Sequence, residues 1–368
     1  MQNGTYDYMI QSSVELYSGY LQIHGKDYWE KRSIDQSIII QSGELESYSS
    51  LPNITHCVPR IESFVLISRN TSTRVTQIVG IDPSRENAMT GLSKRIESGR
   101  YLHNNDKGIL IGSGLAKFLD VTCGDSVIVY GQGFHGVTAA ASIPVVGILN
   151  FPIPVLNNAM SYITIEYAQW LFDAPGRVTS IAFMISSQNQ LSDIQSQLKQ
   201  VAGKNTEVMT WKEMMPELVQ SIQVDSAGGI IMLLILYIVI GFGIFGTIMM
   251  MTNERIREFG ILISVGMKRW KLISIAVIET ILISLIGAGA GIVTGIPILW
   301  YLYSNPIPLT GDTASAMLAY GLEPIIPFSI DPAIFIAQTS TVFILAVICA
   351  VYPFLVIKKL KPVAAIRS

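Results

Sequence analysis

Residues 228–251 read GGIIMLLILYIVIGFGIFGTIMMM, with no charged residue in 24 positions. As an α-helix this stretch is about 36 Å long, enough to cross the roughly 30 Å hydrocarbon core of a bilayer with some tilt. Residues 272–303 and 333–357 have the same character, and Glu279 is the only charged residue in either. We therefore predict three membrane spans, at 227–251, 272–303 and 333–357, rather than the buried helices of a large soluble core.

The composition supports this prediction. Only 14% of the residues are charged, whereas a soluble protein carries roughly 25%. The net charge of −2 gives no indication of a nucleic-acid partner. Residues 1–226 hold 16 basic and 21 acidic residues, as an ordinary water-soluble domain would. A soluble enzyme is excluded.

The basic residues of the membrane part indicate its orientation. Five lie in the loop 252–271 and four in the tail 358–368, whereas the loop 304–332 has none. Lys and Arg accumulate on the cytoplasmic side of membrane proteins. We therefore expect 252–271 and 358–368 to be cytoplasmic, and 1–226 and 304–332 to be extracytoplasmic.

Residues 1–226 alternate between strand and helix patterns, which predicts an α+β domain. Stretches rich in β-forming residues occur at 37–40, 63–68, 75–81, 108–111, 126–130, 137–149, 162–165, 178–185 and 207–210. Leu191, Ile194, Leu198 and Val201 recur at helical spacing. We expect a small α/β layer built from the two ends of the domain, a β-rich insert at about 75–175, and a helix over 211–224 that runs directly into the first span.

A large domain ahead of the first span needs a signal to cross the membrane. The opening residues MQNGTYDYMIQSSVELY have neither a basic region nor an apolar run. We infer that a span is missing upstream, either because the start was assigned too late or because the chain was shortened. Four spans are then expected in the full-length protein.

Several motifs in the outer domain do not support catalysis. Residues 131–136 match the dinucleotide-binding glycine pattern but precede a predicted strand, which indicates a hairpin loop. Gly112-Ser-Gly114 has no third glycine and indicates a plain turn rather than an anion site. The chain has no P-loop, no nucleophile elbow and no Cys-x-x-Cys pair. We expect no enzyme activity, no cofactor and no metal site.

The histidines and cysteines are scattered. His24, His56, His103 and His135 stand singly, and we interpret each as a surface or hydrogen-bonded residue rather than a metal ligand. Cys349 lies in an apolar run and indicates a packing residue. A disulfide between Cys57 and Cys123 stays open.

Two features of the second span point to specific roles. Gly287, Gly291 and Gly295 stand four residues apart, a spacing that favours a helix-packing face toward this chain or a second copy. Glu279 lies about 12 Å into the span. An ionisable residue there is either a functional site or a snorkelling or helix-paired carboxylate near the cytoplasmic interface.

The cytoplasmic loop contains ERIREFGILISVGMKRW, residues 254–270. It is short, basic and amphipathic, which predicts a helix on the membrane surface or a docking knob for a cytoplasmic protein. Its apolar side would carry Ile256, Phe259, Ile261 and Leu262, and its water-facing side Glu254, Arg255, Arg257 and Glu258. Gly260 and Gly266 would permit sharp turns.

This loop resembles that of the FtsX-like permeases, whose pattern is close to E-R-x-x-E-x-G-x-L-x-x-x-G. The closing run YPFLVIKKLKPVAAIRS resembles the family's C-terminal signature, with Pro362, Ala365 and Arg367. The opening ELYSGYLQIHGKDYWE resembles the lipoprotein-release permeases of LolC and LolE type in particular. Residues 99–129 resemble the β-rich insert of those proteins and of the exporter MacB.

The resemblance implies an ABC transporter permease in the bacterial inner membrane. It would work with a cytoplasmic ATPase that binds ATP and Mg²⁺, a second permease copy or homologue, membrane lipids and a periplasmic lipoprotein or adaptor. Motion of the ATPase would reach the periplasmic domain by mechanotransmission, for lipoprotein release. Alternatives are MacB-like export of a peptide or drug, and FtsX-like control of a periplasmic hydrolase. The ATPase-coupling residues would be Glu254, Arg255, Arg257, Glu258, Phe259, Gly260, Leu262, Gly266 and Met267.

Overall fold

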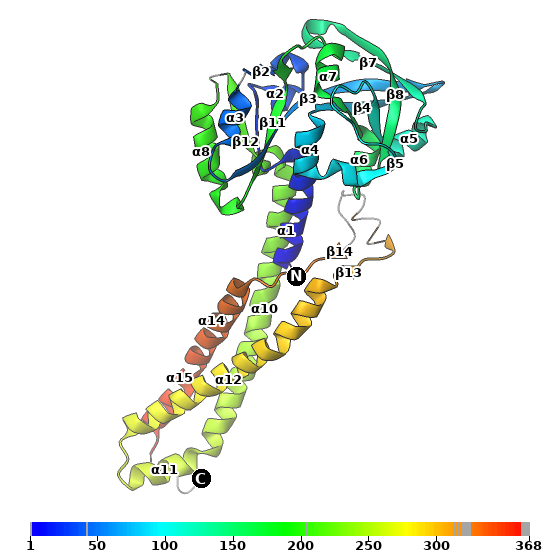
Figure 1. The fold of residues 1–368 in the computed structure, drawn as a ribbon. Coiled ribbons are helices and arrows are strands. Elements are labelled where there is room, and N and C mark those ends of the chain that lie inside the picture. Colours follow the sequence, from blue (N-terminus) through cyan, green and yellow to red (C-terminus); the bar gives the residue numbers. More distant parts are fainter. Residues whose placement is uncertain are drawn as a thin grey trace. The chain divides into compact units, whose positions relative to one another are not determined.

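The structure is a computed structural model that describes residues 2–361 apart from 42, 204, 313, 315, 316 and 318–324. The chain divides into two compact units. The α+β unit comprises 7–220 with 308–325, and the helical unit comprises 1–6, 221–307 and 326–368. Figure 1 draws the elements of both units.

A ten-stranded sheet organises the α+β unit, in the order β12-β1-β11-β3-β4-β9-β6-β8-β5, with β7 paired to β3 and β8. Its strands are β1 (Leu21–Gly25), β3 (Ile54–Arg69), β4 (Ser72–Ile81), β5 (Ile96–Gly99), β6 (Ile109–Gly112), β7 (Ser126–Gln132), β8 (Thr138–Leu149), β9 (Met160–Thr164), β11 (Ser180–Ile185) and β12 (Thr206–Thr210). The short strands β2 (Ile38–Ile39) and β10 (Arg177–Val178) pair with each other.

The helices of this unit are short. They are α2 (Tyr28–Lys31), α3 (Glu44–Ser49), α4 (Pro83–Thr90), α5 (Ser113–Leu119), α6 (Pro154–Ala159), α7 (Ile165–Leu171), α8 (Leu191–Val201) and α9 (Trp211–Met214). Helix α1 (Gln2–Ser13) and a π-helical turn (Val14–Ser18) precede β1. The structure confirms the predicted α+β class, because β1 pairs with β11 and β12 from the other end of the domain.

Helix α7 packs on β4 at Gly80, a residue without a side chain. A Cβ on Gly80 would lie 2.3 Å from Cβ of Ala168 and 2.4 Å from Cγ2 of Ile61. The glycine therefore permits the helix to approach the sheet closely, and Ile61, Ile78 and Ala168 join one buried core cluster.

The glycine pattern at 131–136 is a hairpin loop between β7 and β8, as predicted. Gly112 and Gly114 lie at the junction of β6 and α5, and a Cβ on either would collide with Asn157 or Asn158. These glycines allow close packing of α6, which agrees with a turn rather than an anion site. Cys57 and Cys123 are both free thiols.

The helix predicted over 211–224 is interrupted at Met215, although its second part belongs to α10 and runs directly into the first span as predicted. Thr210 and Glu213 form a capping box that starts α9, but the helix ends at Met215 (φ −125°, ψ 62°) and α10 begins at Pro216. A residue that precedes proline is disfavoured in the α-helical conformation. Any rigid connection through this segment therefore begins at α10.

The helical unit contains three helices long and apolar enough to cross a membrane, among the residues described. They are α10 (Pro216–Glu254), α12 (Arg269–Ser304), and α14 (Pro332–Cys349) together with α15 (Val351–Lys359). The short helix α11 (Ile256–Ser264) joins α10 to α12, and β13 (Ile307–Pro308) pairs with β14 (Ile325–Ile326). The third span is interrupted at Ala350, because Pro353 lacks the N–H that would bond one turn back.

His24 departs from the sequence prediction. It is fully buried in β1, and neither ring nitrogen has a hydrogen-bond partner among the described residues. Its ring stacks on Trp29 with centroids 5.7 Å apart. Burial, and secondly the charge of Arg32, lower the pKa of His24 to about 4. The strand therefore holds a neutral imidazole as an aromatic packing group.

Acid should destabilise the α+β unit through His24. Its pKa lies below that of the unfolded chain, so its contribution is complete above pH ~6.5 and is lost as the pH falls toward ~4. Between about pH 7.5 and about pH 5 the loss should be about 2 kcal/mol. We expect His24→Phe to reduce this dependence in urea unfolding monitored by tryptophan fluorescence, whereas the control His56→Gln should retain it. An unchanged slope in His24→Phe contradicts the assignment.

Candidate functional site

The segment between α10 and α12 forms a helical hairpin. Helix α11, within it, ends in a Schellman motif. The Met267 N–H donates to the Leu262 carbonyl at 3.0 Å, and the Gly266 N–H donates to the Ile263 carbonyl at 3.1 Å. Gly266 has φ 105°, a conformation that favours glycine. The prediction of a sharp turn is confirmed at Gly266. It is wrong at Gly260, which is a buried residue within α11.

One side of α11 packs into a small apolar cluster. Phe259 and Ile263, one helical turn apart, lie against this cluster together with Met267. Its buried members, Leu272 and Ile273 of α12 and Ile357 of α15, are supplied by two other helices. Helix α11 is therefore held by both α12 and the end of the third span.

The other side of α11 is exposed. Arg257 and Glu258 reach solvent as predicted. Ile261 and Leu262 are also exposed, by 45% and 39%, instead of packing with Phe259. The exposed residues include Glu254, Arg257, Glu258, Ile261, Leu262, Val265 and Lys268. This surface combines apolar groups with both signs of charge.

The sequence analysis placed Arg255 on the water-facing side of the loop. In the structure Arg255 lies between α10 and α11 and forms an ion pair instead. Its Nη1 donates to both carboxylate oxygens of Glu279 in α12, at 2.8 and 2.7 Å. Phe259 and Thr252 border a cavity of only ≈ 20 Å³ beside the pair. Of the two roles considered for Glu279, the structure displays the paired carboxylate.

Two further contacts were not predicted. Arg269 donates to the carbonyl oxygens of Lys358 at 2.7 Å and Leu360 at 3.0 Å, at the end of α15. The Tyr352 hydroxyl donates to Oδ1 of Asn253 at 3.2 Å. A cation near the C-terminus of a helix is a recognisable pattern, but the sequence could not indicate that Arg269 serves another helix.

The three glycines of α12 have open space beside them. A Cβ on Gly287, Gly291 or Gly295 would meet no described atom within 4 Å. Gly287 borders an apolar cavity of ≈ 490 Å³ lined also by Gly243 of α10 and Val342 of α14. The described part of this chain does not supply a helix against these glycines, so their packing role stays a prediction.

The predicted C-terminal residues Pro362, Ala365 and Arg367 lie outside the described residues. Among the residues described, no group of three or more His, Cys, Asp or Glu side chains is placed to hold a metal ion. The hairpin around α11 is the candidate site that the sequence predicted, and its exposed side carries apolar groups together with both signs of charge.

Comparison with known proteins agrees with this architecture. The MacB-like periplasmic core domain family matches residues 3–201, and the FtsX-like permease C-terminal family matches residues 230–362. An ABC transporter permease of Mycobacterium tuberculosis is 27% identical over 65% of this chain and 27% of its own length. The lipoprotein-releasing system transmembrane protein LolC of Xylella fastidiosa is 22% identical over 68% of this chain and 62% of its own.

Similar solved structures are periplasmic or extracellular domains. The periplasmic region of MacB from Actinobacillus actinomycetemcomitans covers 60% of this chain and 98% of its own, at 14% identity and a TM-score of 0.40. The extracellular domain of the transporter YknZ covers 52% and 99%, at 13% identity and a TM-score of 0.37.

The α+β domain, the apolar helices and the two family matches together define a multi-pass membrane protein with an extracytoplasmic domain, in the class of ABC transporter permeases. More particularly, the chain belongs to the FtsX-like permeases with a MacB-like periplasmic core domain. Permeases of this family have neither an ATPase activity nor a cofactor of their own. The chain spans about a quarter and about three fifths of the two curated relatives named above.

Arg255 and Glu279 should behave as a coupled pair in a double-mutant cycle. We expect Arg255→Met and Glu279→Gln each to lower the thermal unfolding midpoint in detergent. The double variant should lose less than the sum, with a coupling free energy of about 1 kcal/mol because both side chains are partly exposed. Strictly additive losses would show that the two side chains do not interact.

Gly266 should respond to its backbone conformation rather than to space, since a Cβ at this position would meet no described atom within 4 Å. Gly266→Val should destabilise the end of α11 by about 1 kcal/mol, and Gly266→Asn by less, because Asn tolerates positive φ. Amide hydrogen exchange at 262–267 measures the effect. Equal exchange rates in both variants would contradict this explanation.

Proposed function

We propose that this chain is the permease subunit of an ABC-type complex, and that a cytoplasmic ATPase subunit docks on the exposed side of α11. ATP hydrolysis by that partner would move α11, and the helices would carry the motion to the extracytoplasmic domain. The observation that carries the proposal is the fixation of α11 by Arg255–Glu279 and by the apolar cluster with α12 and α15.

The distribution of basic residues supports a cytoplasmic location for α11. All nine Lys and Arg of 227–368 lie in the segments 252–271 and 358–368, which the positive-inside rule assigns to the cytoplasm of a bacterial inner membrane. The extracytoplasmic domain then lies across the membrane from α11. In this proposal the ATPase docks on one side of the membrane, and the domain that it controls lies on the other side.

The packing of α11 supports transmission rather than simple anchoring. A loop that only anchors the chain needs no fixed orientation. Here Phe259 and Ile263 pack on α12 and α15, and Arg255 bonds Glu279 one helix away. Packed elements transmit displacement because protein interiors resist compression. A push on Arg257 or Glu258 would therefore displace two spans together.

Lipoprotein release is the cargo function that we propose first, supported by the 22% identity to LolC over 68% of this chain. The MacB-like core domain over residues 3–201 supports export of a peptide or drug as the alternative. Neighbouring genes separate them: a periplasmic lipoprotein carrier accompanies release, and an adaptor with an outer-membrane channel accompanies export.

A second permease copy or homologue is part of the same proposal. Gly287, Gly291 and Gly295 leave space that a neighbouring helix could enter closely. Membrane lipids would cover the remaining apolar surface of α10, α12 and α14. This dimer assignment is a prediction from residue type and spacing.

The docking proposal is tested by reversing the exposed charges of α11. We expect Arg257→Glu with Glu258→Arg to lower stimulation of the ATPase encoded by a neighbouring gene by roughly tenfold or more, since truncating one central interface contact can cost that much. Pull-down with this ATPase measures binding directly. Both side chains are exposed, so the permease should keep its unfolding midpoint.

Glu217 provides the matched control. It is an exposed residue in the first turn of α10, at the opposite end of that helix from α11. Glu217→Arg should leave binding and stimulation unchanged. Normal ATPase binding and stimulation by the α11 variant would overturn the docking site.

A further inference from the structure

Arg60 occupies a special position in the sheet of the α+β unit. It lies in β3 opposite Ser180 of β11 on one side and Ile81 of β4 on the other. Before Arg60, β3 pairs with β11; after it, β3 pairs with β4 and, from Val65, with β7. Arg60 therefore marks the point where β3 passes from the small α/β layer into the β-rich part.

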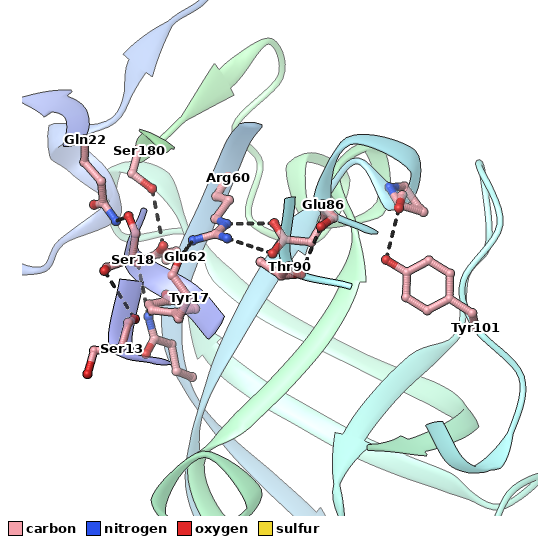
Figure 2. Close-up of polar contacts among 12 residues, drawn as sticks. Ser13, Tyr17, Ser18, Gln22, Arg60, Glu62, Glu86, Thr90, Tyr101 and Ser180 are labelled. Atoms are coloured by element: carbon pink, nitrogen blue, oxygen red, sulfur yellow. Dashed lines mark hydrogen bonds and ion pairs between the residues drawn. The ribbon is translucent and has the colours of Figure 1, made fainter. Parts of the chain in front are cut away.

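The Arg60 side chain is fully buried and joins two other elements (Figure 2). Nε donates to Oε2 of Glu86 at 2.8 Å, and Nη2 donates to Oε1 at 2.7 Å. Nη1 donates to the backbone carbonyl of Tyr17, and the guanidinium lies 4.8 Å from the centroid of the Tyr17 ring. One cation thus connects β3 to helix α4 and to the turn after α1.

The Tyr17 carbonyl belongs to the π-helical turn that ends α1. That turn closes with a bond from the Gly19 N–H to the Val14 carbonyl at 2.9 Å. The last carbonyls of a helix lack intrahelical partners and carry its negative dipole end. The next carbonyl, of Ser18, accepts from Nε2 of Gln22 at 2.7 Å. Arg60 and Gln22 together cap this helix end from inside the domain.

The glycine after the turn lets the backbone lie close to the sheet. Gly19 has φ 69°, and a Cβ there would lie 2.8 Å from the Phe183 carbonyl oxygen of β11. The Tyr20 N–H donates to that same carbonyl at 2.9 Å. The end of α1 is therefore attached to β11 by its backbone and to β3 by Arg60.

A second carboxylate of β3, that of Glu62, also accepts several hydrogen bonds. Glu62, two residues along β3, accepts from Nε2 of Gln77 at 3.1 Å and from the hydroxyls of Tyr28 and Ser180, each at 3.3 Å. Gln77 also donates to the Tyr17 hydroxyl at 2.9 Å. Burial and the Glu62 charge raise the pKa of Tyr17. The phenol therefore stays protonated.

Stability alone does not account for this arrangement. A buried ion pair is often matched or exceeded in stability by apolar side chains of similar size. Arg60 and Glu86 are exposed by 0% and 1% at their side chains, so both charges are desolvated. What an apolar pair cannot supply is the directional bond to the Tyr17 carbonyl.

We infer that Arg60 is a positioning residue that fastens the end of α1 to the strand shared by both halves of the sheet, so that α1 and β3 move as one body. The division between the two compact units falls within α1, after Tyr6, so this helix belongs to both. A displacement carried along α1 would enter the sheet at the residue where β3 changes partners. That consequence rests on the proposed transport function, whereas the joint itself does not.

The test measures the joint directly in the full chain in nanodiscs. Spin labels are placed at exposed Gln11 of α1 and exposed Ser142 of β8, with the three native cysteines replaced by serine. Pulsed electron–electron double resonance measures the distribution of distances between the two labels. We expect a narrow distribution in the parent and one at least about twice as broad in Arg60→Met/Glu86→Met, because packing is retained while the bond to α1 is lost.

Arg69→Met is the matched control. Arg69 also lies in β3 and pairs with Asp125 at 2.7 Å, but it does not contact α1 among the described interactions. Its distribution should stay as narrow as that of the parent. Should the double variant fail to fold, Arg60→Lys decides, since lysine retains the charge but lacks the planar fork whose separate nitrogens bond Glu86 and the Tyr17 carbonyl.

An unbroadened distribution in the folded double variant, or in Arg60→Lys if only that folds, overturns the inference. This readout needs no ATPase, so a negative result leaves the docking of the ATPase on α11 untouched. Conversely, a broadened distribution with normal ATPase stimulation would confirm the joint and separate it from coupling. Retained ATPase binding with lowered stimulation would connect the two.

Discussion

The ion pair between Arg255 and Glu279 is the interaction on which the helical unit depends. A lone carboxylate within a span is costly in the membrane, and a lone guanidinium at its border would be drawn to water. Each residue is tolerable because the other lies within 2.8 Å. Their contact fixes the junction of α10 and α11 against α12, and this in turn determines which side of α11 remains exposed.

Three arginines near helix ends bond to another element among the described residues. Arg255 follows the last residue of α10, Arg269 binds the carbonyls at the end of α15, and Arg60 binds a carbonyl in the turn that ends α1. Arg269 and Arg60 place a guanidinium at the negative end of a helix dipole, whereas Arg255 binds the carboxylate of Glu279. Arginine suits this role because its planar fork can satisfy a carboxylate and a carbonyl at once. In each case a helix end is attached to a different element.

The two units differ in what holds them. The α+β unit has a large apolar core and a sheet in which nearly every strand has two neighbours. Among the described residues of the helical unit, the buried apolar cluster is small and centred on Leu272, Ile273 and Ile357. Lipid must therefore solvate most of the surface of the spans, and specific contacts, many of them at their α11 end, hold the spans together.

Composition and local pattern determined the spans and the α+β class, and the local glycine turn at Gly266 was also predictable. These depend on the apolar character of long segments and on neighbours a few residues apart. The same reasoning failed at Gly260, because a glycine in sequence does not reveal whether it turns the chain or lies inside a packed helix. It also failed at Met215, where the proline that follows interrupts the predicted helix.

Only the tertiary structure decided the partners of Arg255, Arg60 and His24. The pairs Arg255–Glu279 and Arg60–Glu86 join residues 24 and 26 positions apart, and Arg60 reaches Tyr17 across 43. The sequence predicts that a charged residue needs a partner if it is buried, because desolvation of an unpaired charge is costly. The sequence does not identify that partner, because the choice depends on how strands and helices that are distant in sequence come together in the fold.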